Sequence, residues 1–264
     1  MKKLFLFALF AALCCSCTES GTDENTDPNG GSNSGQTTPP DPDSDAKDVI
    51  HVPKGGMLAG ILNELGLKSP SSLKLSGTLG VSDFTTLRNI QSLEHLDISR
   101  VNLSVLPTEA FLECTNIKSV ILPNTLTAIG TQAFWGSSLV SISIPASVET
   151  IEDQAFEGCS LLATVTFEKG SQLKTVDGFS NCTALTTVDM SACTQVTRIE
   201  YRAFYEDSKL QLFKIGTRTP PSCGRNVFTG INSYSVLKVP AGCVDAYKNA
   251  TGWKEFTTIS ELDE

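Results

Sequence analysis

The stretch I-K-S-V-I-L-P-N-T-L-T-A-I-G-T-Q-A-F, residues 117–134, is closely followed by L-V-S-I-S-I-P-A-S-V-E-T-I-E-D-Q-A-F, residues 139–156. Both stretches have the same order of apolar residues, a proline and an Ala-Phe pair, and a third copy begins at Leu162. Self-similarity at a fixed short period is typical of proteins built from stacked repeats. The repeat therefore takes precedence over any local pattern in predicting the fold.

The repeat extends over most of the chain. Its phenylalanines recur every 22 to 25 residues, and the apolar residues that open the units recur at the same spacing. The phenylalanines are Phe111, Phe134, Phe156, Phe179, Phe204 and Phe228, and the opening residues are Leu93, Ile117, Leu139, Leu162, Leu185 and Leu210. The spacing predicts units stacked in one phase.

Each unit contains the signals of a strand and a return segment. The alternation in L-x-x-V-x-L predicts a strand with one buried face. The following proline (Pro123 or Pro145) has no N–H to donate and ends the strand. We expect Ala-Phe to lie on a short helical turn on the opposite side. A single unit cannot bury its own apolar face, so neighbouring units must stack and place their strands in a parallel, concave sheet.

The units resemble the BspA-like leucine-rich repeats of surface proteins from anaerobic Gram-negative bacteria. Strand, Ile, Ala-Phe and Cys recur in register from about Leu93 to Leu262. The resemblance implies an α/β repeat protein: a right-handed leucine-rich-repeat solenoid with short helical turns on its convex side. It also implies a binding or adhesion scaffold without enzyme activity. Departures include Gly178 and Val227, which replace the Ala before Phe, and an irregular last unit from Pro220 to Gly230.

The N-terminal residues have the pattern of an export signal. Residues 1–16 place two lysines before an apolar run, which is typical of a secretory signal peptide. The L-C-C-S-C sequence resembles a bacterial lipobox, which implies cleavage before Cys17 and lipidation of that residue. Modification of Cys15 and an ordinary soluble signal peptide are the alternatives. Residues 18–47 are rich in Gly, Ser, Asp and Pro, which predicts a disordered tether.

The repeats require a cap at each end. We assign residues 48–92 to an N-terminal cap, 93–236 to the repeats and 237–264 to a C-terminal cap. Met57, Leu58, Ile61, Leu62 and Leu65 have helical spacing, and a second helix is expected over Asp83–Ile90. In the C-terminal cap we expect a last strand at Leu237, a short helix and a buried Trp253. Such caps cover the apolar ends of a solenoid.

Charge and cysteine spacing exclude some function classes. The net charge of −9 argues against nucleic-acid binding. Cys114, Cys159 and Cys182 each follow a repeat Phe by three residues, so we expect buried free thiols there. A Cys159–Cys182 bond is geometrically conceivable, and a Cys223–Cys243 bridge is a further alternative. Beyond Cys14–Cys17 there is no C-x-x-C, and we expect no metal or cofactor.

The candidate binding face consists of the strand positions that flank each middle apolar residue. These are His95, Asp97, Ser119, Ile121, Ser141, Ser143, Thr164, Thr166, Thr187, Asp189, Leu212 and Lys214. Only His95 and Asp97 suggest acid–base chemistry, with Ser119 as the nearest hydroxyl, and nothing marks this serine as activated. An exposed pair without a catalytic role is the preferred interpretation.

These features predict a non-catalytic outer-membrane lipoprotein displayed on the cell surface. Acidic residues just after Cys17 resemble the export tags of surface lipoproteins, which favours outward display. The expected partner is a protein or the host extracellular matrix, with membrane contact through the lipid only. The alternative is a glycan-binding accessory lipoprotein of a polysaccharide-uptake system. The sequence leaves the partner and the oligomeric state open.

Overall fold

A computed structural model describes residues 48–263 of the 264-residue chain. The predicted signal peptide, the lipidated Cys17 and the tether lie outside the described residues. Within the described part, no helix is long and apolar enough to cross a membrane.

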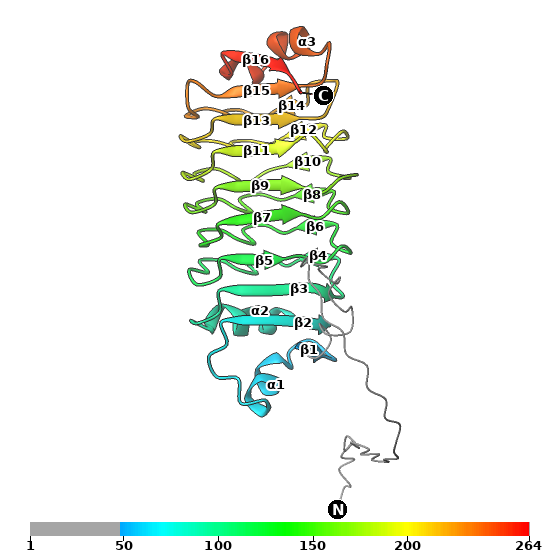
Figure 1. Ribbon diagram of the computed structural model, residues 1–264, viewed down its shortest axis with the longest axis vertical. Coiled ribbons are helices and arrows are strands. Elements are labelled where there is room, and N and C mark those ends of the chain that lie inside the picture. The colour runs from blue at the N-terminus through cyan, green and yellow to red at the C-terminus, as the bar shows by residue number, and fades with distance from the viewer. Residues whose placement is uncertain (1–47, 264) are drawn as a thin grey trace, which may run out of the picture. The chain divides into compact units, whose positions relative to one another are not determined.

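The described chain is a column of stacked coils (Figure 1). Each repeat contributes one longer strand, one two-residue strand and one turn that carries the repeat Phe, and every strand pairing is parallel. The longer strands form two sheets: β1 (Val49–Val52), β2 (Ser72–Gly77), β3 (His95–Val101) and β5 (Ser119–Ile121), then β7 (Ser141–Ile144), β9 (Thr164–Phe167), β11 (Thr187–Met190), β13 (Leu212–Ile215), β15 (Val236–Val239) and β16 (Thr258–Glu261). The solenoid prediction is therefore confirmed.

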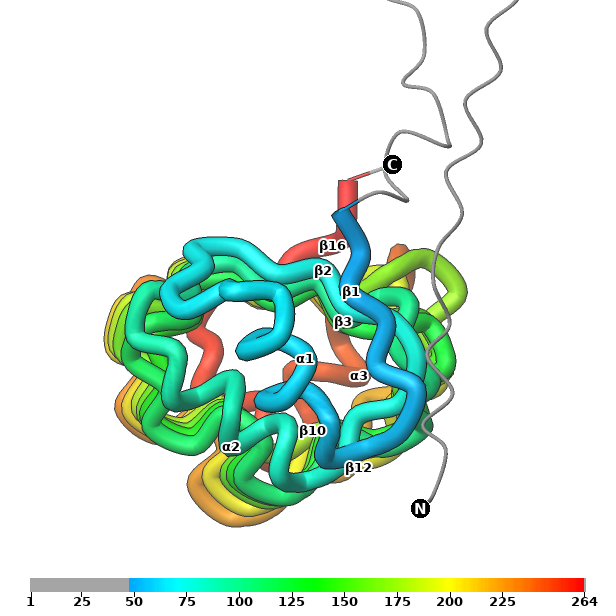
Figure 2. The backbone as a smooth tube through the Cα atoms, turned by 90° about the horizontal axis from the view of Figure 1, so that it is seen from below, coloured from blue at the N-terminus to red at the C-terminus, as the bar shows by residue number. Residues whose placement is uncertain are grey.

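The short strands form a third sheet on another side of the column. They are β4 (Val105–Leu106), β6 (Ala128–Ile129), β8 (Thr150–Ile151), β10 (Thr175–Val176), β12 (Arg198–Ile199) and β14 (Ser222–Cys223). Seen along the column, the coils superimpose as rings around one core (Figure 2). Sequence analysis predicted an apolar return segment here but no strands.

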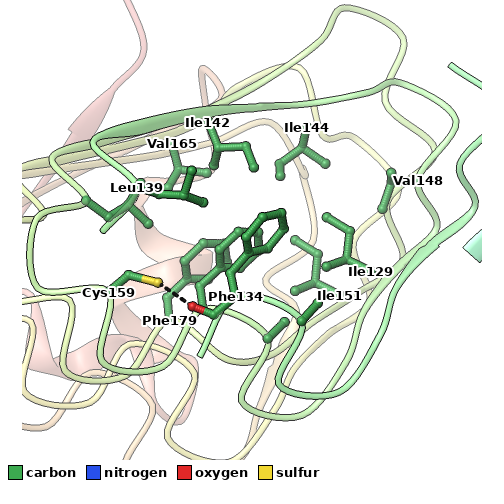
Figure 3. Close-up of a cluster of buried hydrophobic side chains, with 14 of the residues drawn as sticks. Ile129, Phe134, Leu139, Ile142, Ile144, Val148, Ile151, Cys159, Val165 and Phe179 are labelled. Carbon is green, nitrogen blue, oxygen red and sulfur yellow. Dashed lines mark hydrogen bonds between the residues drawn. The ribbon is translucent and has the colours of Figure 1, made fainter. Parts of the chain in front are cut away.

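The repeat phenylalanines form a stack through the core. Centroids of successive rings from Phe111 to Phe228 lie 4.7 to 5.7 Å apart, and their planes differ by at most 14°. These distances are typical of offset aromatic stacking. Figure 3 shows Phe134 and Phe179 in this stack, surrounded by aliphatic side chains that include Ile142, Ile144 and Ile151. All six rings are at most 1% exposed, so one continuous core joins the coils.

Perpendicular rings terminate the stack at both ends. Phe84, on α2 (Val81–Asn89), meets Phe111 edge-on at 5.6 Å. Beneath it, α1 (Leu58–Glu64) buries Leu58 and Leu62. The buried carboxylate of Asp83 accepts three backbone N–H groups, from Gly56, Leu58 and Gly80, at 2.6 to 2.9 Å, and so ties the two helices together.

At the C-terminal end, α3 (Val244–Asn249) and the 3₁₀ turn η2 (Trp253–Glu255) cover the last coil. Trp253 is fully buried, as the sequence predicts, and its Nε1 donates to the Pro221 carbonyl at 3.0 Å. Sequence analysis missed the terminal strands β1 and β16. Of the residues with helical spacing, Met57 and Leu65 lie just outside α1 and are 44% and 56% exposed.

The Ala-Phe segments differ from the expected helical turns. Residues on both sides of each Phe have positive φ, for example Gln132 at 54° and Gly136 at 63°. In this conformation every second backbone N–H of the turn points along the column. The Phe134 N–H, for example, donates to the Ala155 carbonyl of the next coil at 2.7 Å. The turns therefore form a third hydrogen-bonded side.

One coil is shorter than the others at the Phe turn. Five residues lead from the short strand to Phe in the neighbouring coils, as from Ile151 to Phe156, but only three lead from Val176 to Phe179. Gly178, in the position of the usual Ala, has a φ of +85°, and an added Cβ would lie 2.3 Å from the Ala155 nitrogen. The glycine is therefore required by the shortened turn.

Truncating one ring in the middle of the stack should destabilise the whole column. Phe156→Ala removes a fully buried side chain between two stacked rings. We expect a loss of about 3–5 kcal/mol and a fall in Tm on the order of 10 °C, measured by thermal and urea unfolding. As a control, Lys174→Ala breaks only an exposed ion pair with Glu149 and should cost less than about 1 kcal/mol. Equal stabilities of the two variants would show that Phe156 is not a core residue.

Replacing Gly178 of the short coil with the usual Ala should destabilise the fold. Gly178→Ala introduces both a left-handed alanine and a clash with Ala155. Gly170→Ala is the matched control, because its φ is +83° and nothing lies within 4 Å of the added Cβ. We expect about 1–2 kcal/mol of destabilisation for the control and about 1–3 kcal/mol more at Gly178. A Gly178→Ala variant as stable as Gly170→Ala would contradict the close approach.

Candidate binding surfaces

The predicted face residues lie in two outward rows along the longer strands, which we call the strand face. The parallel register aligns the residues of each row on successive strands. In one row Ser141 pairs with Thr164 and Thr164 with Thr187; in the other, Ser143 pairs with Thr166 and Thr166 with Asp189. The N-terminal part contains His95 beside Ser119 and Asp97 beside Ile121. At the other end, Leu212 and Lys214 lie beside Thr187 and Asp189. The middle strands thus present small hydroxyl groups over a core of Val and Ile.

The N-terminal part of this face brings a histidine and a serine together. His95 Nδ1 lies 2.8 Å from Ser119 Oγ at an exposed position. Asp97 does not complete a triad with them, because its Oδ1 accepts the Ser99 backbone N–H at 2.9 Å. Activation of a serine requires an oriented base and a site that stabilises developing charge. The recorded contacts provide neither, so the arrangement is a surface hydrogen bond.

Charged residues flank the C-terminal part of the strand face. Lys214 Nζ lies 2.9 Å from Asp189 Oδ2, and Lys238 on β15 pairs with Asp263, which follows β16. Burial raises the pKa of the Asp189 carboxyl, but hydrogen bonds from Ser191 and Lys214 outweigh it and lower the pKa overall. The Asp189 carboxylate is therefore charged at neutral pH and forms an ion pair with Lys214. The face has a neutral centre and a charged C-terminal edge.

The position three residues after the repeat Phe forms a column in the core, occupied by three thiols, one hydroxyl, one carboxyl and, in the last coil, Ile231. Cys159 Sγ donates to the Phe134 carbonyl at 3.0 Å (Figure 3), and Cys182 Sγ donates to that of Phe156 at 3.2 Å. The six cysteines in the described residues are free, so neither bridge that the sequence left open is formed. Burial raises the pKa of the Cys182 thiol well above its usual range. The hydrogen bond from Cys182, in turn, lowers the pKa of the Cys159 thiol. Both side chains are fully buried and act as packing groups in the core.

Asp207 occupies the same column and was not singled out from the sequence. Its side chain is fully buried, and its Oδ1 accepts the Cys182 backbone N–H at 2.8 Å. Oδ2 has no hydrogen-bond partner among the described residues. Burial raises the pKa of the carboxyl well above its usual range, and the bond from Cys182 opposes this only in part. The signal in the sequence was an acid at a position that other coils fill with Cys, Ser or Ile.

Removing this charge should stabilise the protein at high pH. A folded-state pKa above the unfolded value means that the folded state binds more protons, so stability falls as pH rises through that window. Asp207→Asn keeps the acceptor for Cys182 and removes the contribution of this carboxyl to the pH dependence of stability. We expect its Tm to exceed that of the native chain by about 2–4 °C or more at pH 8, with a smaller difference at pH 4.5. A lower Tm than the native chain at pH 8 would show that the ionised carboxylate is stabilising.

The sequence of this chain matches a known protein family. Six copies of the BspA-type leucine-rich repeat region match residues 82–211 and 176–259. No curated protein matches the chain. Among solved structures, a leucine-rich repeat protein from Bacteroides ovatus is 18% identical, with a TM-score of 0.42 over 81% of this chain and 69% of that one.

Two further solved structures are similar at the same level. A leucine-rich cell surface protein from Faecalibacterium prausnitzii is 16% identical, with a TM-score of 0.31 over 74% of this chain and 73% of that one. A leucine-rich repeat protein from Eubacterium ventriosum is 23% identical, with a TM-score of 0.41 over 53% of this chain. This chain spans only 44% of the latter's length. On the repeat match, which extends from residue 82 to residue 259, the chain belongs to the BspA-type leucine-rich repeat family.

Proposed function

We propose that this protein is a non-catalytic binding protein of the cell surface whose strand face contacts a protein or host-matrix partner. The observation that carries the proposal is the pair of outward rows, in which Ser141, Ser143, Thr164 and Thr166 form a patch of short polar side chains. Short side chains on paired strands lose little conformational entropy on contact. Their hydroxyls can donate or accept hydrogen bonds.

The surface location rests on sequence features outside the described residues. The lipobox-like sequence before Cys17 and the polar residues 18–47 would anchor and extend the domain from an outer membrane. A family of leucine-rich repeat proteins suits this role, because stacked repeats provide an extended binding surface. Protease treatment of intact cells should therefore remove the domain, and an uncut protein would contradict outward display.

A glycan-binding role has weaker support. Sugar sites commonly stack a ring on an exposed aromatic side chain, whereas the middle of the strand face carries hydroxyls. Tyr201 and Tyr205 lie on the Phe-turn side, and the Arg202 guanidinium covers their rings at 5.0 and 4.6 Å from the centroids. The experiment below therefore includes polysaccharides, and their binding would favour this alternative function.

A charge-insertion experiment tests the strand face directly. The full chain would be titrated against a panel of purified extracellular-matrix proteins and soluble polysaccharides by biolayer interferometry. The double variant Ser143→Lys/Thr166→Lys should weaken binding to the matrix protein by at least about tenfold. Both positions are exposed and pair across β7 and β9, so folding should be retained.

The matched control inserts the same charge elsewhere. Gln195→Lys/Ser208→Lys changes two exposed positions that are off the strand face, and its affinity should stay within about twofold of the native chain. Equal binding by both double variants would contradict a role for the strand face. Binding of a polysaccharide and of no matrix protein would replace the proposal with the glycan-binding function.

A further inference from the structure

The shortened coil opens a gap on the Phe-turn side of the column. In the full-length coils, the residue two before Phe donates its N–H to the residue three before Phe in the next coil. The distances are 3.0 Å from Glu109 to Thr131, 3.0 Å from Gln132 to Asp153 and 3.1 Å from Arg202 to Arg225. The coil of Phe179 lacks two residues at this corner. This series of hydrogen bonds is therefore interrupted between the short coil and both of its neighbours.

The gap leaves a backbone donor and a backbone acceptor without their usual partners. Within residues 48–263, neither the Gln154 N–H nor the Tyr201 carbonyl has a recorded backbone hydrogen bond. Bonds closer to the ring persist, from Phe156 to Gly178 at 2.6 Å and from Phe179 to Ala203 at 2.8 Å. The interruption is thus confined to the space that the two missing residues would have filled.

A cavity of about 280 Å³ occupies this space. Asp153 and Gln154 line it from the preceding coil, Asp177 and Gly178 from the short coil, and Tyr201 and Arg202 from the following coil. Its size is close to the lower limit of small-molecule sites. A side chain at Gly178 would clash with the backbone of Gln154 and Ala155 beside the cavity.

The charges around the cavity are unbalanced. Asp153, Glu157 and Asp177 contribute three carboxylates to the lining, and Arg202 contributes one guanidinium. That guanidinium lies over the Tyr201 and Tyr205 rings. Burial, followed by the negative charges of Asp153, Glu200 and Glu157, raises the pKa of Asp177 to about 7, against a hydrogen bond from Gly178. Adding a cation to this site would offset that repulsion.

We propose that the gap binds an alkylammonium or guanidinium group, either a Lys or Arg side chain of a polypeptide or a free polyamine. The three carboxylates and the Tyr201 carbonyl are acceptors, which suits a cation that carries several N–H donors. Among the described residues no cluster of three or more acidic, Cys or His side chains could hold a metal ion. The site lies apart from the strand face and does not depend on the function proposed for it.

Calorimetric titration of the full chain tests this proposal. The probes are an acetylated, amidated Gly-Gly-Arg-Gly-Gly peptide, the same peptide with Lys or with neutral citrulline in place of Arg, and spermidine. At pH 8 the Arg and Lys peptides should bind at least about fivefold more tightly than the citrulline peptide. Binding should weaken at pH 6, because protonation of Asp177 removes one of the carboxylate charges.

Two variants with equal charge change provide the control. Asp177→Asn should weaken binding of the Arg peptide by at least about fivefold at pH 8 and reduce its pH dependence. Glu64→Gln, at an exposed position of α1, should bind like the native chain. Spermidine binding that depends on Asp177, with no peptide binding, would support the cation site and assign it to free polyamines. Equal binding of citrulline and Arg peptides, no binding of any probe, or equal effects of the two variants would overturn the proposal.

Discussion

The spacing between adjacent coils is the constraint on which the structure depends. Parallel strands hydrogen-bonded side by side are about 4.8 Å apart, and all three sides of this column follow that spacing. The phenylalanines stack at nearly the same distance, between 4.7 and 5.7 Å. One ring per coil therefore fills the core without changing the backbone register. Edge-on rings at Phe84 and Phe256 end the stack where the repeat ends.

Because of the same constraint, inward residues determine the stability of the column and outward residues are left for recognition. Inward positions are occupied by a narrow set of apolar residues, because each must fit between identical neighbours. Outward positions carry no such restriction, so the strand face can vary in hydroxyls and charges while the column is retained. Where a coil departs from the common length, the fit between coils fails locally. The cavity beside Asp177 is the result of such a departure.

The sequence predicted the stacked coils and the inward and outward strand positions, because these follow from periodicity, and the burial of Trp253, because a cap must cover the last coil. It did not predict the conformation of the Phe turns, since left-handed Gln132 and Gln154 depend on hydrogen bonds to the next coil. The short strands, two residues each, are too brief to show a period. Gly178 was visible in the sequence as a departure from the repeat Ala. The effect of the two missing residues is seen only when the flanking coils are placed beside the short coil. Asp207 was hidden because burial of its carboxylate depends on the column around it.

Hydrogen exchange of the full chain, resolved at single amides, tests the central claim most directly. If the coils are joined through the Phe turns, the amides of Phe134, Phe156 and Phe179, which donate to the next coil, should share one high protection factor with the strand amides of β7, β9 and β11. Their exchange should occur only through cooperative opening of the column. Exchange of these three amides as fast as that of exposed turn amides would contradict the account.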